Sequence, residues 1–479
     1  MIPLTLAEVA TATGGRLSDV PDPETRVEGA VEVDSRRVAV GGLFVAIPGE
    51  RVDGHDFAAA AVEAGAVAAL TERGVPGVPC VVVPDAVAAL GRLASAVLER
   101  SSAAVVGVTG SSGKTTTKDL LAAVLAAAGE TVAPAGSFNN EVGLPLTVLR
   151  TTPTTRFLVL EYSARGVGHI ATLTRIAPPR YAAVLNVGTS HLGEFGSREA
   201  IARAKGELVE ALPADGVAVL NADDLAVAAM RDRTRARVVH TGESAGTDVR
   251  AEGVDIDATG RASYELVVGE RVRGGAGRAR VALQLVGEHQ VANSLSAAAL
   301  ALEAGLDLPA VAQGLSAARP ASRWRMEVTE RPDGVTVVND AYNANPDSVK
   351  AALKALVTMA RGRRSWAVLG TMAELGDDSG DEHDKIGRLA VRLDVDRLVV
   401  VGPEAARMHA GAVLEGSWGD ESMHVPDVDA AVSLLRQQLA PGDVVLVKAS
   451  RSARLERVAE ALLAPGDGPG PGDAPEAGA

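Results

Sequence analysis

The sequence predicts an α/β protein of three domains, and three observations support that fold class. Short runs of valine, alanine and leucine alternate with helix-length amphipathic segments, which is the pattern of sheets covered by helices. A glycine-rich turn at residues 107–116 joins one such run to a helix, as in doubly wound parallel sheets. The chain has 479 residues, about three times the usual size of one domain.

Residues 1–100 predict a small N-terminal α/β domain. Its strands and helices follow from apolar runs and amphipathic periods bounded by turn residues. The expected strands are Val31–Arg36, Gly42–Ile47 and Cys80–Val83, and the expected helices are Phe57–Ala64 and Val87–Glu99.

Residues 101–320 predict a central, doubly wound domain with a phosphate-binding loop. The helix Thr115–Ala128 follows the glycine-rich turn, and the expected strands are Ala103–Val108, Phe157–Leu160, Tyr181–Leu185 and Val217–Leu220. Between about residues 236 and 286 the rhythm changes to short alternating strands with a Gly/Arg turn at Arg273–Arg278. This stretch predicts an antiparallel side sheet.

Residues 321–463 predict a C-terminal, Rossmann-like α/β domain. Its expected strands are Val335–Val338, Trp366–Leu369, Arg397–Val401 and Asp443–Val447, and helices separate them. Residues 464–479 are dominated by glycine and proline without apolar periodicity, so a disordered tail is expected there.

Composition excludes several classes of protein. Apolar residues make up 47% and charged residues 23%, which is usual for a globular protein, and the net charge of −14 argues against nucleic-acid or membrane-surface binding. The single cysteine, Cys80, cannot form an internal disulfide. The N-terminus lacks a basic leader segment, and no uncharged apolar stretch could span a bilayer. We therefore expect a cytoplasmic protein.

The glycine-rich turn carries the main functional signal. In it, glycines let backbone N–H groups converge on phosphate oxygens, Lys114 neutralises charge on the β- and γ-phosphates, and the Thr115 hydroxyl can hold Mg²⁺. The general Walker spacing has glycine at position 108, whereas this chain has Val108 and places glycines at 107, 110 and 113. The turn predicts ATP binding rather than a plain strand-to-helix connection.

Polar residues near predicted strand ends are further candidates. Glu161 follows a buried strand and could bind the same metal, or it could be a solvated strand end. His191 lies in a polar loop and could be a metal ligand or a structural histidine. By composition and pattern alone, Lys205 is a solvated lysine on a helix.

Two polar clusters complete the set. Asn293 lies at the start of an alanine-rich helix, where its amide could contact an adenine edge or simply cap the turn. The loop Asn339–Asp347 gathers amides and carboxylates after a strand, and although such residues also build turns, their concentration favours a binding site.

Up to about residue 463 the chain resembles the Mur ligases of peptidoglycan synthesis. The form of the phosphate loop at residues 109–115 is shared by Mur ligases and folylpolyglutamate synthases. Three further segments are similar to signatures of the Mur ligases that add a dipeptide, namely Ser137–Pro145, Asp340–Ser348 and Val368–Gly376.

The resemblance implies roles for individual residues. For ATP it implies Thr109, Gly110, Ser111, Ser112, Gly113, Lys114, Thr115, Thr116, Asn293, Arg325 and Asp340. For Mg²⁺ it implies Thr115, Glu161, His191 and a carbamylated Lys205, and the expected catalytic residues are Lys114, Glu161, His191 and Lys205. The residues expected to bind UDP lie in the first domain and are Ser35, Arg36, Leu43, Phe44 and His55. Asn139 and Asn140 are expected to bind the muramoyl-peptide, and further substrate-binding candidates are Tyr342, Asn343 and Asn345.

The activity implied by this resemblance is an ATP-dependent ligation of D-alanyl-D-alanine to UDP-N-acetylmuramoyl-tripeptide through an acyl phosphate. The partners are then small molecules, with no nucleic acid and no membrane span, and we expect a monomer. Within the same class, the alternatives are a ligase that adds a single amino acid and a folate ligase that adds glutamate. From another class, the alternative is a P-loop protein that binds ATP to switch partners without making a product.

Overall fold

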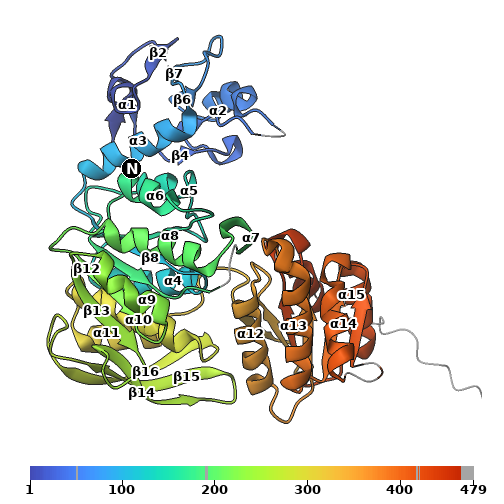
Figure 1. The fold of residues 1–479 in the computed structure, drawn as a ribbon. Helices are drawn as coiled ribbons and strands as arrows, with labels where there is room; N and C mark the ends of the chain where they lie inside the picture. Colours follow the sequence, from blue (N-terminus) through green and yellow to red (C-terminus); the bar gives the residue numbers. More distant parts are fainter. Residues whose placement is uncertain (50–51, 189–191, 417–418, 420, 465–479) are drawn as a thin grey trace, which may run out of the picture. The chain divides into compact units, whose positions relative to one another are not determined.

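The computed structural model describes residues 1–49, 52–188, 192–416, 419 and 421–464. The predicted tail, residues 464–479, lies outside the described residues apart from Ala464. The chain forms two compact units, one up to Ser322 and one from Arg323 onward, apart from a short turn at residues 258–260 (Figure 1). Within the described ranges, no helix is long and apolar enough to cross a membrane.

The N-terminal part of the first unit is a small sheet with helices, as predicted. The strand order is β2-β7-β6-β5-β4, parallel except for the β2–β7 pair. The strands are β2 (Arg16–Ser18), β4 (Val31–Glu32), β5 (Leu43–Val45), β6 (Ala68–Thr71) and β7 (Cys80–Val82), beside a β1–β3 ribbon (Leu4–Thr5, Arg26–Val27); the helices are α1 (Leu6–Thr13), α2 (Ala58–Glu63) and α3 (Ala86–Glu99).

The predicted strand Val31–Arg36 is too long. The strand β4 ends at Glu32, and a 3-10 turn, η1 (Ser35–Arg37), follows it. The reason is local, because the Asp34 carboxylate accepts a hydrogen bond from the Arg36 backbone N–H (3.1 Å) and so caps the turn. Such side-chain bonds compete with the sheet for the backbone.

The central sheet has the order β16-β15-β14-β13-β12-β11-β8-β10-β9. The strands are β8 (Ala104–Thr109), β9 (Thr131–Val132), β10 (Phe157–Glu161), β11 (Tyr181–Val184), β12 (Val217–Asn221), β13 (Arg237–Gly242), β14 (Val249–Ile256), β15 (Arg261–Val268) and β16 (Gly277–Val286). Neighbours from β9 to β14 are parallel, and β14, β15 and β16 are antiparallel. The predicted antiparallel strands are therefore present, but they extend the central sheet instead of forming a separate one, and β13 is parallel.

Around β10, both faces of this sheet are buried. Along β10, Leu158 and Leu160 enter one hydrophobic core while Phe157 and Val159 enter another, because side chains alternate across a strand. The helices around the sheet are α4 (Lys114–Ala126), α5 (Gly143–Val148), α6 (His169–Ile176), α7 (Leu192–Phe195), α8 (Arg198–Glu210), α9 (Leu225–Ala228), α10 (Gln290–Glu303) and α11 (Leu308–Ala317).

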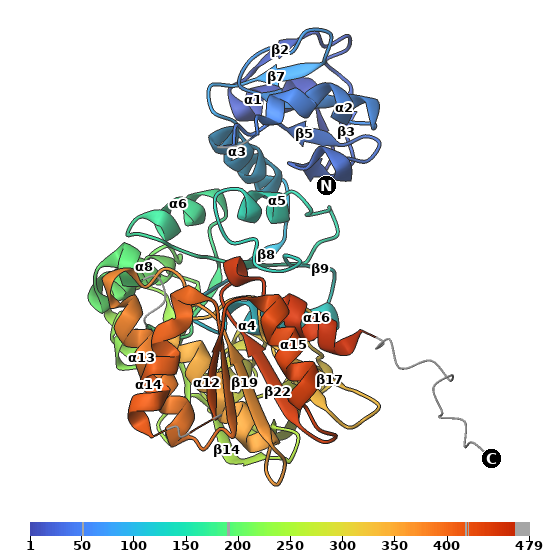
Figure 2. The same ribbon diagram turned by 90° about the vertical axis from the view of Figure 1, so that its right-hand side faces the viewer.

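The first of these cores does not stop at the predicted domain boundary near residue 100. Leu4, Leu90 and Leu93 belong to the same cluster of buried side chains as Leu158 and Leu160. Helix α3 packs against α5 where the N-terminal part meets the central sheet (Figure 2). The N-terminal and central parts thus share apolar packing within one compact unit.

The second unit is a sheet of order β17-β18-β22-β19-β20-β21, parallel except for the edge strand β17. This agrees with the predicted second α/β domain. The strands are β17 (Glu327–Glu330), β18 (Thr336–Asn339), β19 (Ser365–Leu369), β20 (Arg397–Val401), β21 (Ser422–Val425) and β22 (Val444–Lys448); the helices are α12 (Pro346–Met359), α13 (Ser379–Arg392), α14 (Ala406–Glu415), α15 (Val428–Gln438) and α16 (Glu456–Leu463).

We predict that Leu93→Ala destabilises the first unit as a whole. The side chain is fully buried in the shared core, and removing it leaves a cavity that costs about 2–5 kcal/mol. Urea unfolding should show the N-terminal and central parts losing structure in one transition at lower urea. Leu225→Ala is the matched control, because Leu225 is 85% exposed and its loss should change the free energy of unfolding by less than about 0.5 kcal/mol. Two separate transitions in Leu93→Ala would contradict the shared core.

Candidate functional site

The glycine-rich loop between β8 and α4 is held open by its neighbours. Gly113 is the N-cap of α4 with φ of +81°, and no side chain of the described residues caps this helix. The side chain of Asn186 fixes the loop from β11, because its Oδ1 accepts the Ser112 N–H (2.9 Å) and its Nδ2 donates to the Ser112 carbonyl (3.2 Å). No side chain of the described residues thus occupies the N-terminal end of α4, where the helix dipole favours an anion.

The start of the loop is tied to the neighbouring strands. The Thr109 hydroxyl donates to the Tyr162 carbonyl (2.7 Å), and the Ser111 hydroxyl accepts the Gly188 N–H (2.9 Å). The backbone of Gly110 runs close to Leu185, since a Cβ there would lie 3.0 Å from the leucine Cβ. These contacts leave the loop little freedom to rearrange around a ligand.

Asn293 lies directly against this loop. A Cβ built on Gly113 would come within 2.3 Å of the Asn293 Oδ1, so this position has room for glycine alone. The Asn293 amide is buried and donates to Gln290 Oε1 (2.8 Å), and the N-cap of its helix α10 is His289 instead. Asn293 is therefore not the N-cap of α10, and the contact of its amide with an adenine edge stays a prediction.

The first residues of α4 carry the predicted charge and hydroxyls. Lys114 curls back over the loop and donates from Nζ to the Gly110 carbonyl (2.7 Å). The Thr115 hydroxyl lies 3.0 Å from the Ser137 hydroxyl, and Thr116 follows in the first turn. An ammonium group at this place faces the part of the loop where a phosphate chain would bind.

Glu161 is a buried carboxylate and not a solvated strand end. It is the last residue of β10, which pairs with β8, and it is fully buried. Its Oε2 accepts a hydrogen bond from Asn139 (3.2 Å), whereas its Oε1 has no hydrogen-bond partner among the described residues. A buried carboxylate oxygen without a partner is costly, and a bound cation would satisfy it.

Glu161 and Thr115 fit the oxygen ligands that Mg²⁺ prefers. Over the described part of the chain, no group of three or more His, Cys, Asp or Glu could hold a metal by itself. Within that part of the chain, the Thr115 hydroxyl is the candidate to join Glu161 as an oxygen ligand. The predicted ligand His191 lies outside the described residues.

Lys205 contradicts the expectation of a solvated lysine. It lies on α8, its exposed fraction is 4%, and it makes no hydrogen bond or ion pair with the described residues. Its pKa lies well below the usual value for lysine, chiefly because burial disfavours the cation and also because the Lys114 ammonium repels it. The side chain is thus a buried amine with a neighbouring positive charge.

Sequence pattern alone could not identify this burial. Helix α8 packs against α6 and β11, so the face that carries Lys205 is covered by other elements. The charged residues around Lys205 on α8 suggest a solvent-exposed helix, and only the packing shows otherwise.

In the N-terminal part, the predicted substrate residues fall into two groups. Ser35 and Arg36 lie in the η1 turn, where the exposed Arg36 guanidinium binds the Asp34 carboxylate (2.7 Å) and helps to lower its pKa to about 2. Leu43 and Phe44 are core residues of β5 with buried side chains, so only their main chain could meet a ligand.

His55 is buried and both ring nitrogens are already used. Its Nδ1 lies 2.6 Å from the Asp53 Oδ1, and its Nε2 accepts the Glu72 N–H (2.9 Å). The pKa of Asp53 is lowered by hydrogen bonds from His55 and Arg73. His55 thus connects its loop to the end of β6, and its predicted contact with UDP stays a prediction.

Three asparagines among the candidates have local structural contacts. Asn139 donates to Glu161, Asn140 Oδ1 accepts the Gly143 N–H at the start of α5 (2.8 Å), and Asn345 Oδ1 accepts the Ser348 N–H as the N-cap of α12 (2.9 Å). Asn343 is exposed on the loop before α12. Side chains of Asn commonly cap helices in this way.

Within the second unit, the structure brings Arg325, Asp340 and Tyr342 together. The Arg325 guanidinium lies over the Tyr342 ring, 4.2 Å from its centroid. Asp340 Oδ1 accepts a hydrogen bond from the Met326 N–H (3.1 Å), and its Oδ2 forms an ion pair with the Lys448 ammonium (2.6 Å). Lys448 is at the end of β22 and was not among the predicted residues.

Lys448 and Asn186 are functional-site candidates for which the sequence carried only a weak signal. Each stands at or just after the carboxyl end of a predicted parallel strand, which is the signal that identified Glu161. Neither residue type is rare enough at such positions to be singled out by spacing alone.

Comparison with known proteins gives matches along the whole chain. Three family models match in order: the Mur ligase family, catalytic domain, at residues 29–97; the Mur ligase middle domain at 108–301; and the Mur ligase, glutamate ligase domain at 324–451. The UDP-N-acetylmuramoyl-tripeptide–D-alanyl-D-alanine ligase of Mycobacterium tuberculosis is 52% identical, covering 97% of this chain and 98% of its own. That of Bacillus subtilis is 32% identical, covering 97% and 99%.

Solved structures agree with these matches. MurF from Acinetobacter baumannii superposes with a TM-score of 0.85 at 31% identity, covering 96% of this chain and 99% of its own. MurF ligase from Thermotoga maritima, solved in complex with ADP, has a TM-score of 0.76 at 31% identity, covering 91% and 97%.

We predict that Gly113→Ala weakens nucleotide binding. The new methyl group would meet the Asn293 carboxamide, in addition to the cost of about 1–2 kcal/mol for a left-handed non-glycine residue. Titration with a fluorescent ATP analogue should show at least a tenfold weaker affinity, roughly 1.4 kcal/mol.

The matched control for this variant is Gly168→Ala. Gly168 is also a left-handed N-cap, of α6, with φ of +93°, but nothing lies within 4 Å of its missing Cβ. This variant has the same backbone cost and should keep its affinity for the nucleotide. Equal loss in both variants would refute the close contact between the loop and Asn293 as the cause.

Proposed function

The chain belongs to the Mur ligase family, and from that premise we propose that it joins D-alanyl-D-alanine to UDP-N-acetylmuramoyl-tripeptide at the expense of ATP. The observation that carries the chemistry is the uncapped start of α4 beside the buried, unpaired oxygen of Glu161. The choice of substrates is supported by the names of relatives that match over nearly the full chain. The solved relative with ADP supports the use of ATP.

The first step is the phosphorylation of a carboxylate. A carboxylate oxygen of the tripeptide attacks the γ-phosphorus, a new P–O bond forms, and the bond to the β–γ bridging oxygen breaks to release ADP. Both reactants are anions, so their approach requires positive charge at the site. Lys114 and the N–H groups at the start of α4 supply it beside the phosphate chain.

The second step is the formation of the amide. The free amine of the dipeptide attacks the carbonyl carbon of the acyl phosphate and gives a tetrahedral intermediate. Phosphate leaves, and the amine nitrogen loses its extra proton to solvent. Water must be kept from the acyl phosphate, because hydrolysis would waste it.

We propose that Glu161 and the Thr115 hydroxyl hold one Mg²⁺, and that His191 contributes to holding a second. When bound, these ions supply further neutralisation of phosphate charge. The support for Glu161 is its buried Oε1, and the support for Thr115 is its place in the first turn of α4.

We propose further that Lys205 is carbamylated. A neutral lysine amine attacks the carbon of CO₂, an N–C bond forms, and the proton leaves to water, so that the side chain becomes an anion. Burial keeps the amine neutral, and the Lys114 ammonium nearby favours the carbamate once it has formed. The anion then contributes to binding a second Mg²⁺.

The alternatives differ in product and not in nucleotide binding. A ligase that adds one amino acid, or a folate ligase, would release ADP with other substrates, and a P-loop regulatory protein would show no release that depends on a carboxylate substrate. ADP release should therefore be measured with UDP-N-acetylmuramoyl-tripeptide, with and without D-alanyl-D-alanine, and against a panel of amino acids. The monomeric state and the cytoplasmic location stay predictions.

We predict that Lys114→Ala lowers ADP release by roughly 10²-fold or more, because a charge that stabilises the transferring phosphoryl group is lost. The loop backbone is held by Asn186 and should keep its structure, so circular dichroism and the thermal midpoint should change little. Near-normal turnover would disprove the assignment of the phosphate site.

We predict that Lys205→Ala loses most activity and that short carboxylic acids restore part of it by supplying an anion. Lys205→Arg should stay inactive, because guanidinium keeps its positive charge and cannot form a carbamate. The wild-type protein in ¹³C-bicarbonate should show a carbamate resonance that Lys205→Ala lacks.

Arg203→Ala is the control on the same helix. Arg203 is exposed, and its side chain is not part of the proposed site. The variant should keep both activity and the carbamate resonance. An active Lys205→Arg enzyme would require the carbamate to be withdrawn.

A further inference from the structure

A buried ion pair lies at the carboxyl end of β22, and one of its members, Lys448, has been given no role above. The Lys448 side chain is 2% exposed, and its ammonium donates to Asp340 Oδ2 (2.6 Å) and to the Asn343 carbonyl (2.9 Å). Burial lowers the pKa of Lys448, and the Asp340 carboxylate acts against that shift. Burying such a pair is costly, and breaking it is costlier still.

The pair connects directly to the segment that carries Arg325. The second oxygen of Asp340 accepts the Met326 N–H (3.1 Å), and the Tyr342 N–H donates to the Trp324 carbonyl (3.3 Å). Between these two bonds, the Arg325 guanidinium stacks on the Tyr342 ring. The loop after β18 therefore holds the residue before Arg325, Arg325 itself and the residue after it.

The backbone on both sides of Arg325 is strained. Trp324 has φ of +57° and Met326 has φ of +50°, although neither is glycine. A left-handed conformation is unfavourable for such residues and persists only where surrounding contacts enforce it. At Met326 the enforcing contact is the bond to Asp340, whose carboxylate is oriented by Lys448.

We propose that Lys448 is a positioning residue for the ligase reaction, which fixes the Asp340 carboxylate and thereby holds Arg325 in the orientation in which it meets ATP. This inference rests on the proposed function and on the expectation, implied by the resemblance to Mur ligases, that Arg325 and Asp340 bind ATP. Lys448 itself touches no substrate in this account.

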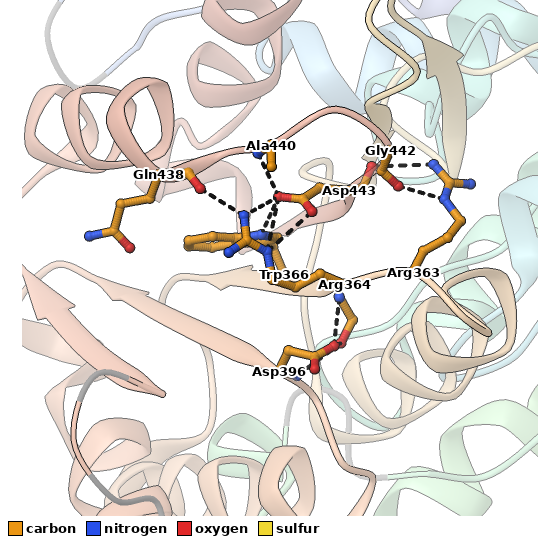
Figure 3. Close-up of polar contacts among 9 residues, drawn as sticks. Arg363, Arg364, Trp366, Asp396, Gln438, Ala440, Gly442 and Asp443 are labelled. Atoms are coloured by element: carbon orange, nitrogen blue, oxygen red, sulfur yellow. Dashed lines mark hydrogen bonds and ion pairs between the residues drawn. The ribbon is translucent and has the colours of Figure 1, made fainter.

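The other end of the same strand offers a matched control. Asp443, just before β22, is buried. Its carboxylate forms an ion pair with Arg364 (2.7 Å) and accepts a hydrogen bond from the Trp366 Nε1–H (2.9 Å) (Figure 3). Arg364 also lies over the Trp366 ring and donates to the Gln438 carbonyl (2.7 Å). This ion pair stands at the amino ends of the parallel strands, whereas ligands bind at the carboxyl ends.

The first experiment measures backbone protection without any reaction. Lys448→Met keeps an unbranched apolar stem and removes the charge, and Arg364→Met breaks the control pair. Hydrogen exchange, followed by mass spectrometry on peptides that span residues 323–330, should show at least tenfold faster exchange in Lys448→Met and no change in Arg364→Met. Unchanged exchange in Lys448→Met would overturn the proposal.

The second experiment is a double-variant cycle in kcat/KM for ATP. Lys448→Met and Arg325→Ala should each lower kcat/KM by about tenfold or more, and the double variant should be no worse than Arg325→Ala alone, because one residue acts through the other. Arg364→Met should keep kcat/KM even where its thermal midpoint falls. Losses that multiply, or an Arg325→Ala variant with normal kcat/KM, would overturn the role in the reaction.

The two experiments separate this inference from the proposed function. If the wild-type protein made no product from the UDP-tripeptide and dipeptide, the proposed function would fail, while the exchange experiment would still decide whether Lys448 holds the Arg325 segment. Should Lys448→Met not fold, Lys448→Gln takes its place, since it keeps a donor for the Asn343 carbonyl and removes the charge.

Discussion

The candidate site depends on one constraint, which is that helix α4 begins after a short loop from the buried strand β8 with no side chain capping it. A Cβ at the N-cap, Gly113, would collide with the Asn293 amide, so the loop can pass this close to α10 only with glycine there. The loop is further fixed because Asn186 holds Ser112 by two hydrogen bonds. A parallel sheet covered on both faces supplies the rigid base for this arrangement.

Two titratable side chains of the candidate site, Glu161 and Lys205, are buried in a way that stability alone does not explain. Glu161 has an unpaired carboxylate oxygen in the interior, and Lys205 is a buried amine whose charged neighbour is another lysine. Both arrangements are unfavourable in the isolated chain. A cation bound at Glu161 and a carbamate at Lys205 would each remove the cost of burying these groups. A role in binding or catalysis therefore explains both residues better than stability does.

The second unit shows the same contrast within a single strand. At the amino end of β22 the Asp443–Arg364 pair ties strands and loops together: Arg364 donates to the Gln438 carbonyl, and Asp443 accepts the Trp366 Nε1–H and the Ala440 N–H. At the carboxyl end the Lys448–Asp340 pair leads to a strained segment with an arginine between two left-handed residues. The buried ion pair at the amino end of β22 thus stabilises packing, whereas the one at the carboxyl end is connected to Arg325, a candidate ligand-binding residue.

Local patterns in the sequence determined the fold class, the order of the strands along the chain and the phosphate loop, because apolar periodicity and glycine spacing are properties of neighbouring residues. They also located Glu161 and Asp340, which follow strand ends. The tertiary structure alone decided that Lys205 is buried, that Val31–Arg36 ends early as a strand, that the strands after residue 236 continue the central sheet, and that Lys448 meets Asp340. Each of these depends on which elements pack together across long stretches of chain, and no local pattern carries that information.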